Sequence, residues 1–202
     1  MLLHIHPKDP QPRLVRTVVD TLKKGGLIIY PTDTIYGLGC DILQQSAIEK
    51  ICRIKQVDPR KAQLSFICSD LSHLSDYTKQ LSTPVFRLLR EYLPGPFTFI
   101  LPASKMVPKI LQGKKDTIGL RIPDNPIALA IIEELGRPIL SASLPGQLVE
   151  DYTDPEVMYE NFRNDVDIVV DGGIGGTVPS TVVDCTGSEP VVTRQGLGEW
   201  GG

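Results

Sequence analysis

Short apolar runs alternate with amphipathic segments over most of the chain, and short apolar runs alone fill its last part. Apolar residues recur at helical spacing from Pro12 to Lys24, and Gly25 begins the stop signal of this predicted helix. Further helices are predicted over 46–56, 83–93 and 125–136. Strands are predicted over 27–32, 63–68, 97–103, 117–123, 137–143, 166–173, 180–186 and 190–196. This order predicts an α/β fold, with a twisted mixed sheet flanked by helices.

The length and composition fit one domain. We expect a single domain over residues 1–202 with a core over about 12–198, because 202 residues can enclose one continuous core. The polar stretch 146–166 is interpreted as an insertion over the sheet. No apolar run approaches the roughly 20 residues that cross a bilayer, so no membrane partner is expected. The N-terminal residues lack a signal-peptide pattern and the four cysteines lack a framework spacing, which indicates a cytoplasmic protein.

A run of basic residues interrupts this mildly acidic chain. Its formal net charge is −3, yet Lys50, Arg53, Lys55, Arg60 and Lys61 fall within twelve positions. One interpretation is a solvated face whose cations complement the dipole of the predicted helix. The other is a local site for a triphosphate, since an Arg fork and Lys point charges suit phosphate groups. Because net charge gives no global attraction to polyanions, any such site must be local.

Hydroxyl groups and one arginine lie at predicted strand ends. The segment 30–39, which contains Thr34, is typical either of a small polar ligand site or of a capped turn before a helix. Arg121 alternates with apolar residues in a strand, so it either points into a site or pairs with an acid. Ser141 and Ser143 share one side of a strand end, where they either bind a ligand or form a turn.

Other patterns carry less weight. The glycine-rich segment 171–184 offers backbone N–H groups to phosphate or is a flexible connection, and Arg194 follows a later strand. His4 and His6 have no acidic or cysteine partner nearby, so no metal site is predicted. Neither a GxSxG motif nor a Cys/His pair is evident, so no catalytic nucleophile is assigned.

Six ordered blocks together resemble one family. These are "YPTDTIYGLGCD", "PGPFTFIL", "IGLRIPDNP", "ILSAS", "PSTVVDCT" and "RQGLG". They resemble the YrdC/YciO family of threonylcarbamoyl-AMP synthase-like proteins, from about Val15 to Gly198. The resemblance implies a single YrdC-like domain with a concave, basic cleft.

The resemblance also implies an activity. Members of this kind convert ATP, L-threonine and bicarbonate into threonylcarbamoyl-AMP and pyrophosphate for the tRNA modification N6-threonylcarbamoyladenosine, with Mg²⁺ accompanying the triphosphate. Thr34 and Arg121 would contact the threonine-derived part, and Ser141 and Thr181 would complete that pocket. The nucleotide would be bound by Lys55, Lys61, Ser143 and Arg194. Positioning and charge neutralisation would replace a catalytic nucleophile, with Lys55, Arg60 and Lys61 as the candidates.

Two departures point to the YciO branch of the family. The synthases carry Lys-x-Arg in the basic block, whereas Val57 stands here at the second cation. They also carry Ser-Ala-Asn where this chain has Ser-Ala-Ser, so Ser143 replaces an amide that both donates and accepts. The alternative function is therefore a protein that binds double-stranded RNA, tRNA or a nucleotide with little or no synthase activity.

Overall fold

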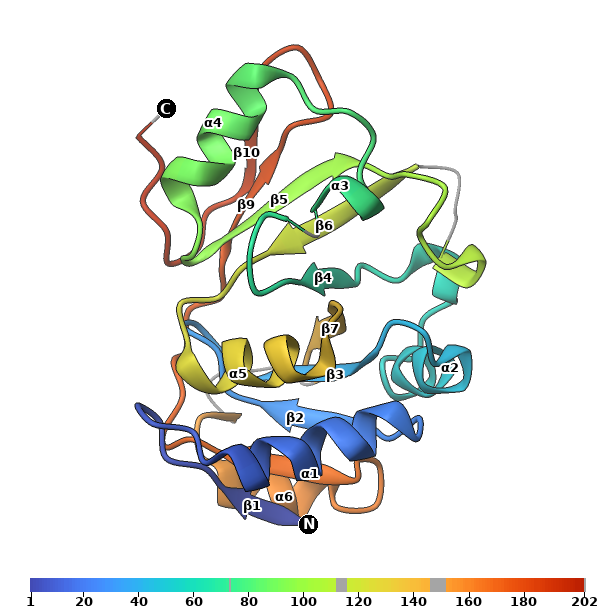
Figure 1. The fold of residues 1–202 in the computed structure, drawn as a ribbon, viewed down its shortest axis with the longest axis vertical. Coiled ribbons are helices and arrows are strands. Elements are labelled where there is room, and N and C mark those ends of the chain that lie inside the picture. Colours follow the sequence, from blue (N-terminus) through green and yellow to red (C-terminus); the bar gives the residue numbers. More distant parts are fainter. Residues whose placement is uncertain (73, 112–115, 146–151, 202) are drawn as a thin grey trace.

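One sheet of ten strands runs through the whole molecule, as the computed structural model shows (Figure 1). The structure describes residues 1–72, 74–111, 116–145 and 152–201. The strand order is β1-β8-β2-β3-β7-β4-β6-β5-β9-β10. The strands are β1 (Leu2–His4), β2 (Ile28–Tyr30), β3 (Gly37–Asp41), β4 (Ser65–Ile67), β5 (Phe97–Pro102), β6 (Thr117–Arg121), β7 (Ile139–Ser143), β8 (Ile168–Asp171), β9 (Thr181–Asp184) and β10 (Val191–Arg194).

The sheet is mixed, as the sequence predicts. Four neighbouring pairs are parallel, namely β1–β8, β2–β8, β4–β6 and β5–β9. The other pairs are antiparallel. The predicted fold class, a single α/β domain with helices flanking a twisted mixed sheet, is therefore confirmed.

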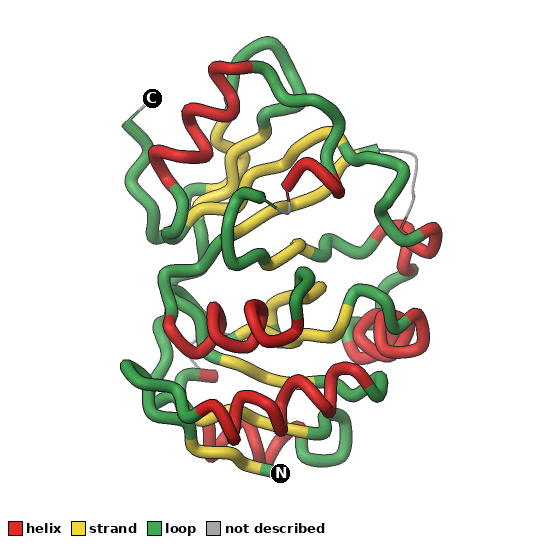
Figure 2. Tube along the Cα trace, in the orientation of Figure 1, coloured by secondary structure: helices red, strands yellow, loops and turns green. Residues whose placement is uncertain are grey.

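Helices pack on both faces of the sheet (Figure 2). They are α1 (Pro12–Lys23), α2 (Gln45–Ile54), α3 (Leu74–Tyr77), α4 (Thr83–Tyr92), α5 (Pro126–Leu135) and α6 (Pro155–Phe162), with short 3₁₀ turns η1 (Pro59–Lys61) and η2 (Lys109–Leu111). The helices α1 and α5 contact each other and share one apolar cluster, whereas α2, α3, α4 and α6 contribute to the other. Among the described residues, no helix has the length and apolar character that crossing a bilayer requires.

The strands have two chemically different faces, and this difference positions the site. In β6, Ile118 and Leu120 enter the apolar cluster of α2, α3, α4 and α6, while Gly119 and Arg121 point to the opposite face. The strand register places small or hydroxyl-bearing residues of neighbouring strands beside them, because directly paired residues share a face. We call this set the polar strip: Gly37, Gly39, Ser65, Thr98, Gly119, Ser141 and Ser143.

The structure corrects two local expectations in part: the turn within the segment 30–39 leads into a strand and not directly into a helix, while the helix-like stretch 146–166 does contain a helix, α6. The segment after residues 30–36 is strand β3, antiparallel to β2, and not a helix. Glycines at Gly37 and Gly39 concealed this strand because they break the apolar pattern that identifies one. The stretch 146–166 is more than an insertion, since Met158 and Phe162 of α6 are buried in the core; residues 146–151 lie outside the described part.

A buried ion pair fixes the start of β7 against the end of β3. The Asp41 carboxylate is fully buried, and Arg137 donates to both of its oxygens, from Nε at 2.8 Å and from Nη2 at 2.5 Å. The backbone N–H of Leu43 also donates to Asp41 Oδ1. Every carboxylate oxygen of Asp41 therefore has a partner, which such a buried charge requires.

We predict that Arg137→Leu lowers the free energy of unfolding by about 3 kcal/mol, because it leaves the Asp41 charge buried without its counter-charge. Urea denaturation with an unchanged m-value measures this loss. An Asp41→Leu/Arg137→Leu double variant should recover most of it. The exposed Arg90 on α4 provides a matched control, and equal losses for Arg90→Leu and Arg137→Leu would contradict the prediction.

Candidate functional site

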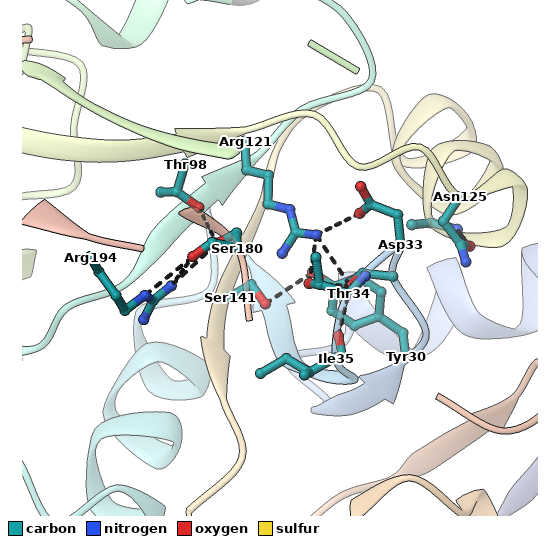
Figure 3. Close-up of polar contacts among 12 residues, drawn as sticks. Tyr30, Asp33, Thr34, Ile35, Thr98, Arg121, Asn125, Ser141, Ser180 and Arg194 are labelled. Carbon is teal, nitrogen blue, oxygen red and sulfur yellow. Dashed lines mark hydrogen bonds and ion pairs between the residues drawn. The ribbon is translucent and has the colours of Figure 1, made fainter. Parts of the chain in front are cut away.

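The Arg121 side chain lies buried between the end of β6 and the loop that joins β2 to β3 (Figure 3). Its Nη2 donates to Asp33 Oδ1 at 2.5 Å and to Thr34 Oγ1 at 2.7 Å. Thr32 holds this loop in shape, since its hydroxyl donates to the carbonyl of Ile35 at 2.7 Å. The structure thus brings together Thr34 and Arg121, the two residues that the family resemblance assigns to the same part of a ligand.

This ion pair uses only part of its hydrogen-bonding capacity. All hydrogen bonds of Arg121 to described side chains leave from Nη2. Asp33 Oδ2 and Arg121 Nε are buried and have no hydrogen-bond partner among the described residues. Such atoms carry a desolvation cost of about 1–3 kcal/mol each.

Tyr30 and Ser141 continue the polar strip next to this pair. The buried Tyr30 hydroxyl donates to Ser141 Oγ at 2.9 Å. Gly39 makes room for the Tyr30 ring, because a Cβ at this glycine would lie 2.9 Å from the ring carbon Cε1. Burial raises the pKa of Tyr30 to about 12, and the Ser141 hydrogen bond opposes this only in part. Tyr30 is therefore a neutral donor that orients Ser141.

Lys55 and Ser143 are also brought together. Lys55 follows α2, and its Nζ donates to the Ser143 carbonyl at 2.8 Å and to Ser143 Oγ at 3.1 Å. Desolvation lowers the pKa of this half-buried ammonium group. Among the described residues no carboxylate pairs with Lys55.

Arg194 reaches the same face from β10. Its Nε and Nη2 donate to the Ser180 carbonyl at 3.2 and 2.8 Å, and Ser180 Oγ lies 2.8 Å from Thr98 Oγ1 of the polar strip. Partial desolvation, and to a lesser extent the positive charge of Arg121, lower the pKa of Arg194. Arg194 likewise has no carboxylate partner in the described part of the chain.

Thr181 lies apart from this group. It pairs with Phe97 in the sheet and so points to the opposite face. Its buried hydroxyl donates to the Gly198 carbonyl at 2.6 Å and accepts from the N–H of Gly196 at 3.0 Å. Ser180, the preceding residue, occupies the position on the polar face that Thr181 was expected to hold.

The basic run at 50–61 does not converge on one point. Lys50 Nζ lies 3.4 Å from the Gly25 carbonyl, at the end of α1. Arg60 pairs with its neighbour Asp58 at 3.2 Å on the surface, and Lys61 is exposed on η1. Val57, at the place of the second synthase cation, has 39% of its surface exposed. Lys55 alone of these residues contacts the polar strip.

A pocket of about 440 Å³ opens beside Asp33 and Thr34. Its other walls come from Asn125 at the start of α5 and from the glycine-rich loop 172–178. That loop donates its N–H groups within the protein: Gly175 to the Thr153 carbonyl and Gly176 to the Thr34 carbonyl. The loop therefore serves as a pocket wall, and these two N–H groups are not available to a phosphate.

Metal-binding and nucleophilic groups do not gather here. Within the described ranges, no three His, Cys, Asp or Glu side chains are grouped so that they could hold a metal ion. His4 instead pairs with Asp171 at 2.6 Å, and His6 accepts from the Asp9 N–H. Burial raises the pKa of Cys68 to about 12 and that of Cys185 to about 11, so neither thiol supplies a thiolate at neutral pH.

Sequence reasoning assigned no role to three residues that shape the site. For Asp33, in the segment 30–39, a ligand contact and a cap of the turn were both left open, whereas Ser180 and Tyr30 were placed only within their segments. The alternation of side chains in β9 was the available signal for Ser180, since Val183 in the core fixes Thr181 to the same side.

Comparison with known proteins identifies the family. Residues 20–196 match the Sua5/YciO/YrdC family, which carries the description "telomere recombination". The uncharacterized protein YciO of Escherichia coli is 45% identical over 199 residues, covering 97% of this chain and 95% of that protein. A threonylcarbamoyl-AMP synthase of Pyrococcus abyssi is 33% identical over 187 residues, covering 90% of this chain but only 54% of the synthase.

Solved structures agree with this relationship. The crystal structure of Escherichia coli YciO superimposes with a TM-score of 0.91 at 44% identity, covering 98% of this chain and 97% of that one. The structure of Pyrococcus abyssi Sua5 with L-threonine gives a TM-score of 0.88 at 30% identity, covering 97% of this chain and 57% of that one. The chain therefore belongs to the Sua5/YciO/YrdC family and is similar to the YciO proteins over nearly its full length.

Proposed function

We propose that this chain binds MgATP on its polar face and forms threonylcarbamoyl-AMP and pyrophosphate from ATP, L-threonine and bicarbonate. The product would supply the tRNA modification N6-threonylcarbamoyladenosine. Similarity to the Pyrococcus abyssi synthase supports this chemistry, as does similarity to a Sua5 structure that holds L-threonine.

The observation that carries the proposal is that two cations, Lys55 and Arg194, have no carboxylate partner among the residues that the structure describes. Lys55 and Arg194 reach the polar face from different elements, and their hydrogen bonds to described residues all go to carbonyl and hydroxyl oxygens. Desolvation of a cation is unfavourable unless an anion approaches it, and it lowers the pKa of both groups. A polyphosphate is the kind of ligand that compensates two such charges at once.

The reaction needs positioning more than it needs a nucleophilic side chain. The threonine amine would attack bicarbonate, forming a C–N bond and releasing water. A carbamate oxygen would then attack the α-phosphate of ATP, and pyrophosphate would leave. Lys55 and Arg194 would neutralise the charge on the phosphates, while Arg121 and Thr34 would hold the threonine-derived part.

Magnesium would arrive with the nucleotide. Because the described residues include no group of three metal-binding side chains, the protein offers no dedicated cage. Asp33, the carboxylate on the polar face, is already paired with Arg121. Mg²⁺ commonly binds through substrate phosphates and water, which fits this set of residues.

A second function rests on the two departures from the synthase pattern. Val57 carries no charge and is exposed, and Ser143 reaches less far than an asparagine. These residues favour a protein that binds a nucleotide, tRNA or double-stranded RNA on the same face with slow turnover or none.

We predict that a Val57→Arg/Ser143→Asn double variant forms threonylcarbamoyl-AMP at least tenfold faster than the native chain, because it restores a cation and an amide near the phosphates. The assay contains MgATP, L-threonine and labelled bicarbonate, and chromatography follows threonylcarbamoyl-AMP and pyrophosphate. Met106→Arg, at a strongly exposed residue, is the matched control for added charge.

Product from the native protein, above the blank without enzyme, supports synthase activity. Product from the double variant alone means that the pocket is retained while the native reaction differs. If neither protein forms product, the synthase proposal is wrong.

The contacts of the basic run generate a further prediction. Lys55→Met should weaken MgATP binding about tenfold to a hundredfold, because it removes a charged donor beside Ser143. Arg60→Met should change the affinity less than about twofold, since Arg60 is paired with Asp58 on the surface. Isothermal titration calorimetry measures both. Equal weakening of MgATP binding by the two substitutions would contradict the prediction and would indicate that the phosphates bind near η1.

RNA binding makes a separate prediction. If double-stranded RNA binds this face, its association constant should fall steeply as salt rises from about 50 to 200 mM, because cations release condensed counterions from phosphates. Fluorescence anisotropy at several salt concentrations measures the slope. A salt dependence near zero would exclude electrostatic RNA binding. If Lys55→Met leaves the salt dependence unchanged, the RNA binds at a surface that does not include Lys55.

A further inference from the structure

The buried hydroxyl of Thr181 has no role in the chemistry proposed above, yet its hydrogen bonds converge on one short segment. It donates to the Gly198 carbonyl at 2.6 Å and accepts from the Gly196 N–H at 3.0 Å. Thr181 is fully buried, so its side chain does not touch a ligand on the polar face. The hydroxyl instead fastens residues 195–198, which we call the C-terminal segment, to the start of β9.

The C-terminal segment lies directly against the backbone that leads into β9. The N–H of Leu197 donates to the Pro179 carbonyl at 2.8 Å. A Cβ on Gly196 would lie 2.5 Å from the carbonyl carbon of Ser180, which is closer than real Cβ atoms come. Glycine at this position therefore allows the two stretches of backbone to cross in close contact.

The β9–β10 ladder ends just before this contact. Its register shifts between Val192 and Arg194, an irregularity of the β-bulge type. Arg194 is the last paired residue of β10, and its partner is Val182. Beyond that pair, the hydroxyl of Thr181 takes over from the ladder, since it binds the backbone that follows Arg194.

Arg194 thus lies between an irregular ladder and the C-terminal segment. Its side chain returns to the residue before β9, because Nε and Nη2 donate to the Ser180 carbonyl at 3.2 and 2.8 Å (Figure 3). The ladder alone does not fix the backbone of Arg194, since a bulge lets a strand bend. The contact between Thr181 and the C-terminal segment therefore completes the support of Arg194.

We propose that Thr181 is a positioning residue for the polyphosphate site: its hydroxyl holds the C-terminal segment against β9 and so keeps the Arg194 guanidinium on the polar face. This inference rests on the proposed function for the ligand, MgATP. A cation that is already in place loses less conformational freedom when phosphates bind, which increases affinity. Thr181 then acts through Arg194 and not by contact with the substrate.

The first test removes the hydroxyl and keeps the shape of the side chain. Thr181→Val should weaken MgATP binding about threefold to tenfold, because Arg194 loses part of its support. Thr181→Ser keeps the hydroxyl and should bind MgATP within about twofold of the native chain. Thr186→Val is the matched control, since it removes an exposed hydroxyl that donates to Asp184 at the other end of β9. Isothermal titration calorimetry measures the affinities, and circular dichroism checks the fold.

The second test asks whether Thr181 acts through Arg194. Arg194→Met should weaken MgATP binding about tenfold to a hundredfold. In the Arg194→Met background, Thr181→Val should change the affinity less than about twofold, because the residue that it positions is gone. Losses that multiply would assign Thr181 a general structural role and would overturn the inference, as would a Thr181→Val variant with native affinity.

Gln195 provides a second variant in case Thr181→Val does not fold. Its exposed side chain donates from Nε2 to the same Gly198 carbonyl at 2.8 Å. Gln195→Met should weaken MgATP binding at least twofold in the native background and leave it unchanged in the Arg194→Met background. Native affinity of the single Gln195→Met variant would overturn the inference.

Magnesium pyrophosphate separates this inference from the proposed function, because it offers phosphates without the nucleoside. Coupling between Thr181 and Arg194 for MgATP supports the inference even where the native chain forms no threonylcarbamoyl-AMP; in that case the proposed reaction fails alone. Coupling for pyrophosphate alone supports the polyphosphate site and rejects ATP as its ligand. Product formation without coupling leaves the proposed reaction standing and rejects the role of Thr181. If the native chain binds neither probe, the inference is wrong.

Discussion

The contact between Arg121 and Asp33 joins two parts of the sheet that are separated by other strands. Arg121 ends β6, while Asp33 belongs to the loop before β3, and β7 and β4 lie between β3 and β6 in the sheet. The side chains therefore meet above the polar strip, not through neighbouring backbone. This requires residues without bulk beneath them, and Gly119, Ser65 and Ser141 meet that requirement. A Cβ on Gly119 would lie 2.9 Å from Ser65 Oγ.

Apolar packing on the opposite face of the sheet offsets the desolvation cost of this polar face. The alternate residues of the same strands, such as Phe99, Leu120 and Leu140, are fully buried in the apolar cluster of α2, α3, α4 and α6. Burial of this kind contributes roughly 25 cal/mol per Å² of apolar surface. The polar face carries Arg121, Ser141 and Thr98 with their desolvation costs, next to the apolar residues that pack under α1 and α5 on the same side of the sheet.

The fold class and the main elements could be predicted from the sequence because the apolar periodicity of the chain is strong. The boundaries of α1, α4, α5 and β5 fall within a residue or so of the predicted ranges. The strand β3 could not be found in this way, because glycines at two of its five positions remove the apolar signal. These glycines accommodate the Tyr30 ring, which is a tertiary requirement that local propensity does not contain.

The candidate site was predictable in its residue types but not in its pairings. Family resemblance selected Thr34, Arg121, Ser141, Ser143, Lys55 and Arg194, and the structure brings these residues to one face. Thr181 was selected on the same resemblance, and the strand register turns it away from the polar face on which Ser180 lies. The run at 50–61 shows the same limit, since spacing along the chain cannot tell that Lys55 turns to Ser143 while Arg60 turns back to Asp58.

Whether a cation has a protein counter-charge then separates functional from structural positive charges in this molecule. Arg137 and Arg60 each pair with a carboxylate, Asp41 and Asp58, which already neutralises their charge. Lys55 and Arg194 have neutral oxygen partners within the described ranges, and no carboxylate there pairs with either of them. Arg121 is intermediate, because its single contact with Asp33 leaves both members of the pair with unused atoms. Two cations without a carboxylate partner in the described part of the chain, together with this partly used ion pair, are therefore the features on which the proposed binding of a polyphosphate and an amino acid rests.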